Sequence, residues 1–353
     1  YEGLKPCLPL LRCPSTSQHS LPLPLLVSWT MSRVLSRSKR RIILCGLGIL
    51  FHQVLKSLPL AQRPSNSHRN LSSLVPSWTM LCLLSPAKAM NLEGGPDCGV
   101  MSQPTMKDTQ ELLKVCKTLT TQDLKKLMGV SDAIAAKDFE RYQQWEKAQR
   151  KAACLAMDGP AYRGFEGESL NDKQRKVAQS KVRILSGLYG VLKPFDAIKP
   201  YRLEMGSALK TNRGKNLYEF WGESIAKQIS QGAKVIVNAA SQEYWKVVKL
   251  AALNGTKVVT VDFPGPAVFA KKARGLICRY AVLHNCQKPE DLKSFSGAPG
   301  DRYVFEAGNS TDAKYVFRRV ADKNGAAAAA SASKKRATGA AAPGAASKRA
   351  KRS

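Results

Sequence analysis

Apolar and polar positions follow two patterns in the middle of the chain. A run of four apolar residues, 81–84, stops at a Ser-Pro-Ala-Lys turn, which is typical of a buried strand leaving a sheet. Other short runs rich in β-branched residues have the same character. The strands that we expect are 81–84, 234–238, 257–261, 302–306 and 314–319, the last two as a hairpin.

Between these runs, apolar residues recur at helical spacing. Ser or Thr stands before several of the periodic stretches and Gly after them, as helix caps do. The helices that we expect are 108–119, one capped by Thr121 that stops at Gly129, one capped by Ser131, 169–186, 216–230, one from Ser241 to about 252, and 268–283. Helices mixed with strands predict a single α+β (mixed α/β) domain with a mixed sheet, over residues 80–323.

The first 79 residues follow neither the strand pattern nor the helix pattern. They are rich in Ser, Pro and Leu, and they contain a duplication: LPLLRCPS (8–15) recurs as LPLAQRPS (58–65), and SWTM (28–31) recurs at 77–80. Two copies are too few for a repeat fold. A basic stretch before the apolar run 42–51 leaves a targeting role open. We expect a leader that is disordered or not translated, and a mature start at Met80.

The last 30 residues, 324–353, are low in complexity, and their small and basic residues predict a disordered tail. Two basic clusters in it have the spacing of a bipartite nuclear-import signal, which an import receptor would bind. Their residues are Lys334, Lys335, Arg336, Lys348, Arg349, Lys351 and Arg352. A tail that only adds affinity for nucleic acid is the alternative.

Charge and cysteine content narrow the classes of function. The chain of 353 residues has a formal net charge of +30, and residues 80–323 alone hold 39 Lys and Arg against 25 Asp and Glu. Such an excess favours polyanionic partners. Nine cysteines form no CxxC pair, and His284 is the one histidine of residues 80–323, so we expect no metal site. Nucleotide-binding motifs are absent, so we expect no cofactor, and run 42–51 is too short to span a membrane.

The expected helix 268–283 carries basic residues on one side. On a helical wheel Lys271, Lys272, Arg274 and Arg279 share a face, opposite Phe269, Ala273, Leu276 and Tyr280. The apolar side would face the core and the cations would contact phosphates of nucleic acid. A solvated surface without a ligand is the alternative.

A glycine-rich turn follows the expected helix 169–186. Its two glycines, with short helical structure expected beyond them, suggest a helix-hairpin-helix-like element, although such hairpins have one residue between the glycines and this one has two. A purely structural turn is the alternative. The candidate nucleic-acid contacts here are Gly187, Leu188, Tyr189, Gly190, Lys193 and Arg202.

Polar residues at the end of the expected strand 234–238 offer a different chemistry. Asn238, Ser241 and Glu243 would lie at the carboxyl edge of the sheet, where α/β proteins bind ligands, and could serve an enzyme of unrecognised chemistry. Ser241 as a helix cap is the simpler interpretation. Glu204 is equally open, since a salt bridge with Arg202 would explain it.

Four segments together resemble the YaaA family of peroxide-stress proteins. They are MLCLLSPAK (80–88), RILSGLYGVLKP (183–194), PYRLEM (200–205) and AKKARG (270–275), and the resemblance covers about 80–320. It implies a mixed α/β fold with a positively charged cleft and a helix-hairpin-helix element, DNA binding, and protection against hydrogen peroxide, in part by lowering free iron. Between 253 and 269 the chain is several residues shorter than the family pattern.

The hypothesis from sequence is therefore a DNA-binding protein of the oxidative-stress response, cytoplasmic and/or nuclear, and not an enzyme. Phosphate contacts do not read sequence, so we expect little sequence preference on duplex or locally unpaired DNA. The enzyme that acts through Asn238, Ser241 and Glu243 is the alternative. The oligomeric state is open.

Overall fold

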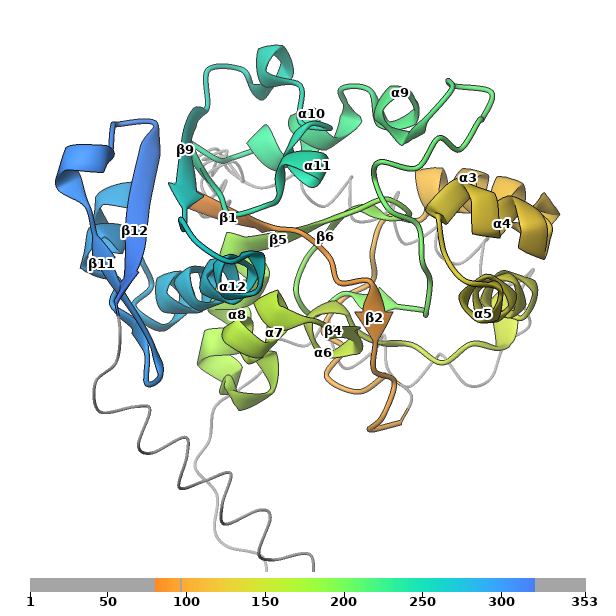
Figure 1. The fold of residues 1–353 in the computed structure, drawn as a ribbon, viewed down its shortest axis with the longest axis horizontal. Coiled ribbons are helices and arrows are strands. Elements are labelled where there is room, and N and C mark those ends of the chain that lie inside the picture. The colour runs from red at the N-terminus through yellow and green to blue at the C-terminus, as the bar shows by residue number, and fades with distance from the viewer. Residues whose placement is uncertain (1–79, 96, 321–353) are drawn as a thin grey trace, which may run out of the picture. The chain divides into compact units, whose positions relative to one another are not determined.

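The structure of the protein is a computed structural model that describes residues 80–95 and 97–320. Within these residues, one mixed sheet of eight strands forms the middle layer (Figure 1). In spatial order its strands are β10 (Gly297–Ala298), β11 (Asp301–Phe305), β12 (Lys314–Val320), β9 (Lys257–Asp262), β8 (Val235–Asn238), β1 (Met80–Leu84), β5 (Val182–Ser186) and β6 (Gly190–Leu192). The predictions for residues 1–79 and for the tail 324–353, import signal included, lie outside the described residues.

Strand β1 lies inside this sheet, sixth in its spatial order. It pairs in parallel with β8 on one side and with β5 on the other, and all five of its residues are buried. Burial on both faces explains why its sequence is an unbroken apolar run. The parallel set continues through β9 to β12, whereas β6, β11 and β10 run antiparallel to their neighbours. The mixed sheet and the hairpin of β11 and β12 are thus confirmed.

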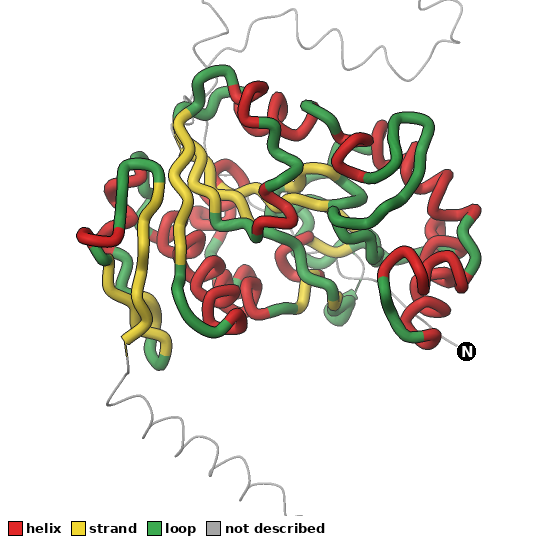
Figure 2. Tube along the Cα trace, turned by 45° about the horizontal axis from the view of Figure 1, so that its top comes forward, coloured by secondary structure: helices red, strands yellow, loops and turns green. Residues whose placement is uncertain are grey.

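Helices cover both faces of the sheet. Figure 1 shows α12, α8 and α7 on one side and α10 and α11 on the other, and Figure 2 shows the strands between these helical layers. The helices are α3 (Lys107–Thr118), α4 (Thr121–Met128), α5 (Asp132–Gln143), α6 (Ala153–Ala156), α7 (Pro160–Phe165), α8 (Asp172–Lys181), α9 (Leu217–Trp221), α10 (Ser224–Ser230), α11 (Gln242–Trp245) and α12 (Ala267–Leu283). The α+β fold class is confirmed.

Short elements complete the fold. Two small antiparallel pairs join β2 (Ala89–Met90) to β4 (Met157–Asp158), and β3 (Lys151–Ala152) to β7 (Ala197–Ile198). Short 3₁₀-helices lie at Trp145–Lys147, Gly167–Ser169, Leu250–Leu253, Pro289–Ser294 and Ala307–Asn309. Helices α3, α4 and α5 gather at the end of the molecule opposite β11 and β12 (Figure 1).

The helix caps agree with the sequence in most positions. Ser131 accepts the N–H of Ile134 and caps α5, and Gly129 ends α4 in the left-handed conformation. The predicted cap at Thr121 is wrong by one residue. Thr120 caps α4, because its side chain and that of Asp123 exchange bonds with each other's N–H groups in a capping box.

The predicted helix 169–186 is wrong over its last five residues. Helix α8 ends at Lys181, and the next five residues form β5, which is buried on both faces. A strand buried in this way shows no alternation, so its apolar residues also matched helical spacing. The helix-hairpin-helix at 187–190 is wrong for the same reason, since this turn joins β5 to the antiparallel strand β6.

Two other predicted helices are shorter in the structure. The stretch 216–230 divides into α9 and α10, because Gly222 takes a positive φ of 48° that stops the first helix. The helix expected from Ser241 to about 252 is the single turn α11, followed by the 3₁₀-helix at Leu250–Leu253.

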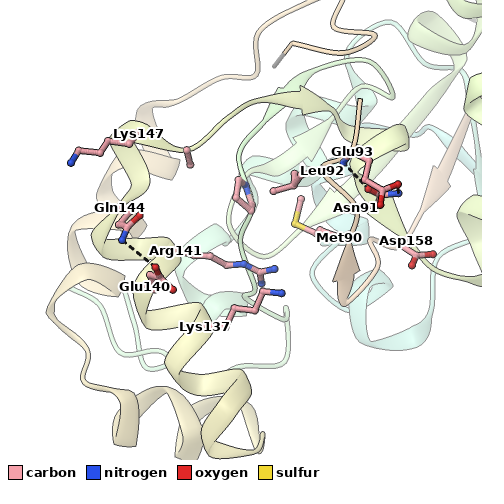
Figure 3. Close-up of a pocket in the computed structure, with 12 residues that line it drawn as sticks. Met90, Asn91, Leu92, Glu93, Lys137, Glu140, Arg141, Gln144, Lys147 and Asp158 are labelled. Atoms are coloured by element: carbon pink, nitrogen blue, oxygen red, sulfur yellow. Dashed lines mark hydrogen bonds between the residues drawn. The ribbon is translucent and has the colours of Figure 1, made fainter. Parts of the chain in front are cut away.

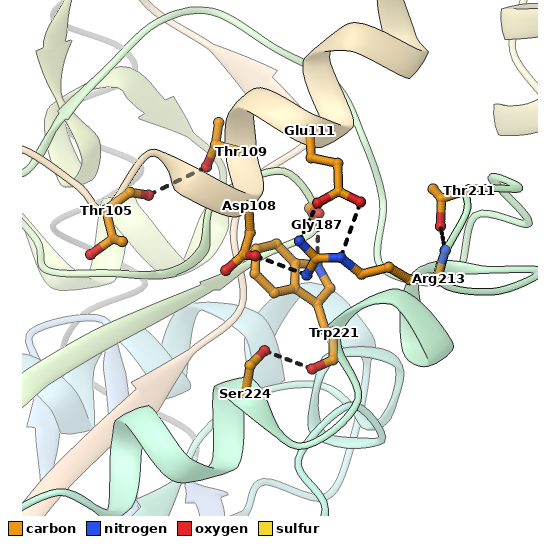
Figure 4. A network of polar contacts seen from close by, with 9 residues as sticks. All are labelled: Thr105, Asp108, Thr109, Glu111, Gly187, Thr211, Arg213, Trp221 and Ser224. Atoms are coloured by element: carbon orange, nitrogen blue, oxygen red, sulfur yellow. Dashed lines mark hydrogen bonds and ion pairs between the residues drawn. The ribbon is translucent and has the colours of Figure 1, made fainter.

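One ion cluster fastens the segment before α9 to helix α3 (Figure 4). The Arg213 guanidinium donates to Asp108 at 2.8 Å and, through Nε, to Glu111 at 3.0 Å. It also lies over the Phe220 ring, with Cζ 4.4 Å from the ring centroid. The cluster thus ties the segment before α9 to α3 and to the Phe220 ring.

Candidate functional site

A cavity of about 340 Å³ lies at the carboxyl ends of β1 and β8. Its walls are the loop after β1 (84–89), the segment 158–162 at the start of α7, the segment 201–204, the residues Ala239, Ser241, Glu243 and Tyr244 after β8, and Lys271 and Arg274 of α12. Parallel strands deliver their following loops to one edge of the sheet, which is where such folds bind ligands. Three of the four segments quoted in the family resemblance, 80–88, 200–205 and 270–275, contribute to this one cavity.

Hydrogen bonds fix the loops around the cavity. Ser241 N–H donates to Ser85 Oγ at 2.8 Å, which ties the loop after β8 to the loop after β1. Tyr162 Oη donates to the carbonyl of Ser85 at 2.9 Å and ties α7 to the same loop. On the other wall, Gly206 N–H donates to Glu243 Oε1 at 3.0 Å. The cavity is therefore held by contacts between segments far apart in sequence.

Helix α12 reaches the cavity because it packs unusually closely on α7. A Cβ atom on Gly275 would lie 1.7 Å from the carbonyl oxygen of Ala161, and one on Gly164 would lie 2.3 Å from that of Lys272. Only glycine permits this approach at both positions. The contact sets Lys271 and Arg274, which are three residues apart and so share a helix face, beside the segment 158–162.

Each carboxylate of the cavity already has a partner. Glu204 bonds Lys88 at 2.7 Å and Arg202 at 3.1 Å, which makes the salt bridge expected from sequence correct. Asp158 bonds Arg163 at 3.1 Å. Glu243 accepts the Gly206 N–H. The acids of the cavity are thus neutralised or hydrogen-bonded within the protein.

Two cations of the cavity have no such partner. Among the described residues, the side chains of Lys271 and Arg274 form no hydrogen bond and no ion pair. The Arg274 Nε atom is buried without an acceptor. Burial lowers the pKa of Arg274 from its ordinary value, against the opposing attraction of Asp262. A half-buried guanidinium without an acceptor is costly, and an anionic ligand would remove that cost.

Two of the four cations expected to contact phosphates from α12 already have partners within the protein. Lys272 Nζ bonds Asp301 at 2.6 Å. Arg279 donates to the carbonyls of Phe165 and Glu166 at 3.0 and 2.9 Å. These partners come from elements distant in sequence, which a helical wheel does not show. On the opposite side Ala273 and Leu276 are buried as expected.

The other residues expected to contact nucleic acid do not lie together in the structure. Gly187, Leu188, Tyr189 and Gly190 are all buried, and Gly190 is required because a Cβ there would lie 2.7 Å from the Trp221 ring. Lys193 is exposed but does not border the cavity, whereas Arg202 does. The turn therefore belongs to the core, and none of its four residues enters our proposal.

The polar trio is only partly brought together. Ser241 and Glu243 border the cavity, but Asn238 does not. Asn238 Oδ1 accepts the N–H of Ala240 at 3.0 Å, so this side chain shapes the turn after β8. Ser241 precedes α11 without a side-chain capping bond, so the cap interpretation is wrong in that respect.

A wider cavity of about 710 Å³ adjoins the first, and Asp158 borders both. It lies between α5 and the loop that carries Met90 and Asn91 (Figure 3). Lys137 and Arg141 point from α5 toward that loop, whereas Lys147 points away from it (Figure 3). Arg141 is bonded to Asp138 at 2.7 Å, but Lys137 is exposed and forms no ion pair with a described residue.

The sequence did not single out Lys88 or Lys137. Lys88 had a signal, because it lies in the loop directly after β1. Lys137 had none, because its neighbourhood depends on how α5 packs. Over the described ranges, no group of three or more His, Cys, Asp and Glu residues is placed to hold a metal ion. No helix in the described part of the chain is long and apolar enough to cross a membrane.

Comparisons with known proteins show the family of the chain. A family model described as "Peroxide stress protein YaaA" matches residues 80–309. A UPF0246 protein of Shewanella baltica is 40% identical over 254 residues, which cover 67% of this chain and 98% of the relative. A UPF0246 protein of Aliivibrio fischeri is 39% identical over 257 residues, which cover 68% and 98%. The chain therefore belongs to the peroxide stress protein YaaA family.

Proposed function

We propose that this protein acts in the peroxide-stress response by binding DNA across the two adjoining cavities. The observation that carries the proposal is that both cavities are bordered by exposed lysines that form no ion pair with a described residue, Lys137 on the α5 side and Lys271 on the α12 side. Cations already neutralised inside the protein gain little from phosphate, whereas free ones release counterions when DNA binds. The excess of basic residues in 80–323 adds a long-range attraction.

The first test is the salt dependence of DNA affinity, measured by fluorescence anisotropy on a labelled duplex between about 50 and 200 mM salt. The double variant Lys137→Gln/Lys271→Gln loses two phosphate contacts. We expect its plot of log affinity against log salt to be shallower by about 2. We also expect the loss of affinity to be the same on unrelated sequences, since phosphate contacts carry no sequence information.

The matched control is Lys176→Gln/Lys257→Gln. Both lysines are exposed and unpaired among the described residues, and neither borders either of the two cavities. Lys257 lies at the amino end of β9, the opposite edge of the sheet. A control that weakens binding as much as the test variant would show that only net charge matters and would overturn the assigned surface.

The same titration separates DNA binding from the enzyme interpretation. The variant Glu243→Gln keeps all four cations of the cavity and alters the carboxylate that an enzyme would use. We expect any change in its DNA affinity to be matched by a change in its protection of cells against peroxide. Protection lost with DNA affinity intact would favour an enzyme.

Two further expectations stand beside this proposal. We also propose that the protein lowers free iron, as the family resemblance implies. No site for this role is assigned among the described residues. Nuclear import through the two basic clusters of 324–353 is proposed from sequence alone. Fusing that tail to a fluorescent protein tests it, and a fusion that stays out of the nucleus would refute it.

A further inference from the structure

The smaller cavity has a charge pattern that calls for a separate ligand. Each of its carboxylates has a partner in the protein, while the side chains of Lys271 and Arg274 have none among the described residues. Both cations lie on one face of α12, three residues apart. A single anionic group bound between them would give the half-buried Arg274 guanidinium an acceptor, through charge-assisted hydrogen bonds.

The inner walls suit a flat apolar group next to that anion. Leu84, Tyr162, Leu203 and Tyr244 line the cavity and are almost fully buried. The hydroxyl of Tyr162 is already used in the bond to Ser85, so what it offers a ligand is ring surface. The volume of about 340 Å³ is at the small end of the range for small-molecule sites, about 300 to 1,000 Å³. One ring system and one anionic group fit this description.

Polar groups at the same cavity suit a ring that carries an amino group. Glu243 borders it, and its bond to the Gly206 N–H uses Oε1, so the carboxylate can still accept a hydrogen bond from a ring amine. Aromatic walls and carboxylates together are the means by which proteins hold nucleobases. A sugar phosphate would leave the aromatic walls unused.

We propose that this cavity binds a nucleoside monophosphate unit, with its phosphate between Lys271 and Arg274 and its base among the aromatic walls. A terminal phosphate carries close to two negative charges at neutral pH, which matches two cations, whereas a phosphate inside a strand carries one. The unit can therefore be a free mononucleotide or the 5′-phosphorylated end of a DNA strand. The proposal does not rest on duplex binding, which needs only the outward lysines.

Isothermal titration calorimetry of the full chain with AMP tests the site. We expect AMP to bind at least tenfold more tightly than either adenosine or inorganic phosphate, because each of these lacks one half of the contacts. We expect Arg274→Gln to weaken AMP binding at least tenfold, and Lys257→Gln to leave it unchanged. AMP that fails to bind, or that binds Arg274→Gln as tightly as the native protein, would overturn the proposal.

Folding of the variant is checked independently of binding. Removing a half-buried charge without partners should leave thermal unfolding of Arg274→Gln unchanged or slightly raised, and Arg274→Lys should recover part of the affinity. AMP should raise the unfolding temperature of the native protein but not that of Arg274→Gln. If both proteins are stabilised equally, the nucleotide binds elsewhere and the site is refuted.

Two single-stranded oligonucleotides distinguish the sources of the unit. If strand ends are the ligand, the 5′-phosphorylated form binds at least tenfold more tightly than the 5′-hydroxyl form, and AMP competes with it. If free nucleotides are the ligand, the two forms bind alike and AMP binding is retained. Duplex affinity measured on Arg274→Gln in parallel keeps the two proposals apart. Loss of AMP binding with duplex binding intact supports the nucleotide site and leaves the proposal of duplex binding unaffected.

Discussion

Whether a cation on α12 has a partner within the protein depends on residues far from it in sequence. Lys272 meets Asp301, 29 positions away, and Arg279 meets the carbonyl of Glu166, 113 positions away. Arg274, on the same helix, meets no acceptor among the described residues. The sequence could show that these side chains share a helix, but not which of them is already satisfied. That distinction separates residues that stabilise the fold from those available to a ligand.

At this scale, Arg213 offers a clear test of stability (Figure 4). Its guanidinium bonds Asp108 and Glu111 and covers the Phe220 ring. We expect Arg213→Ala to cost about 1 kcal/mol, or about 2–4 °C in unfolding temperature, since a partly exposed ion network is worth little more than that. Arg213→Lys should recover less than half, because an ammonium cannot bond two carboxylates in the same fork.

The measurement is calorimetry at low and high salt. The ionic part of the loss should shrink as salt rises, since these side chains are partly exposed. A loss that does not change with salt would assign the effect to packing on Phe220 alone.

At the scale of elements, periodicity predicted the sheet and the long helix better than the parts in between. The runs 234–238 and 257–261 are strands, and 268–283 lies inside α12. The run 182–186 was misjudged because a strand buried on both faces has no alternation to read. Because of this error, the glycine turn was expected between helices, whereas it lies between strands. The sequence predicted Ser241 and Glu243 at the carboxyl edge of the sheet, but not the other walls of the cavity, because these meet only when β1, β8, α7 and α12 are assembled.

Gly275 tests whether the contact of α7 with α12 is essential. An alanine Cβ there would lie 1.7 Å from the Ala161 carbonyl oxygen, so the helices must move apart. We expect Gly275→Ala to lower the free energy of unfolding by about 3 kcal/mol or more, as overpacking of a core does at its upper end. Urea unfolding followed by circular dichroism measures it.

Gly308 supplies the matched control. Nothing lies within 4 Å of a Cβ built on it, so Gly308→Ala should change stability by less than about 0.5 kcal/mol. If both variants unfold at the same urea concentration, the helix contact is looser than the structure shows.

For the molecule as a whole, burial of weak acids predicts sensitivity to alkali. Burial raises the pKa of the Cys116 thiol from 9.0 to about 12 and that of Tyr201 from 10.0 to about 12. Below pH 9 these groups are protonated in both states. Above it, the unfolded chain releases their protons first, so the folded state loses stability between about pH 9 and 12.

Urea midpoints measured from about pH 8 to 11 test this. Each such group should lower the free energy of unfolding by up to about 1.4 kcal/mol per pH unit in its range. Cys116→Ser should lessen the slope above pH 9, although it can lower stability at neutral pH. A midpoint that is constant up to pH 11 would contradict the burial of these groups.

The glycine contact between α7 and α12 also bears on how a ligand would be received. Because two helices are locked at a distance that no larger residue allows, the helix that bears Lys271 and Arg274 cannot slide or tilt to meet its partner. The binding groups are thus preorganised, and little conformational entropy is lost when the site fills. Free and occupied forms should then superimpose closely, with differences confined to the side chains of the two cations.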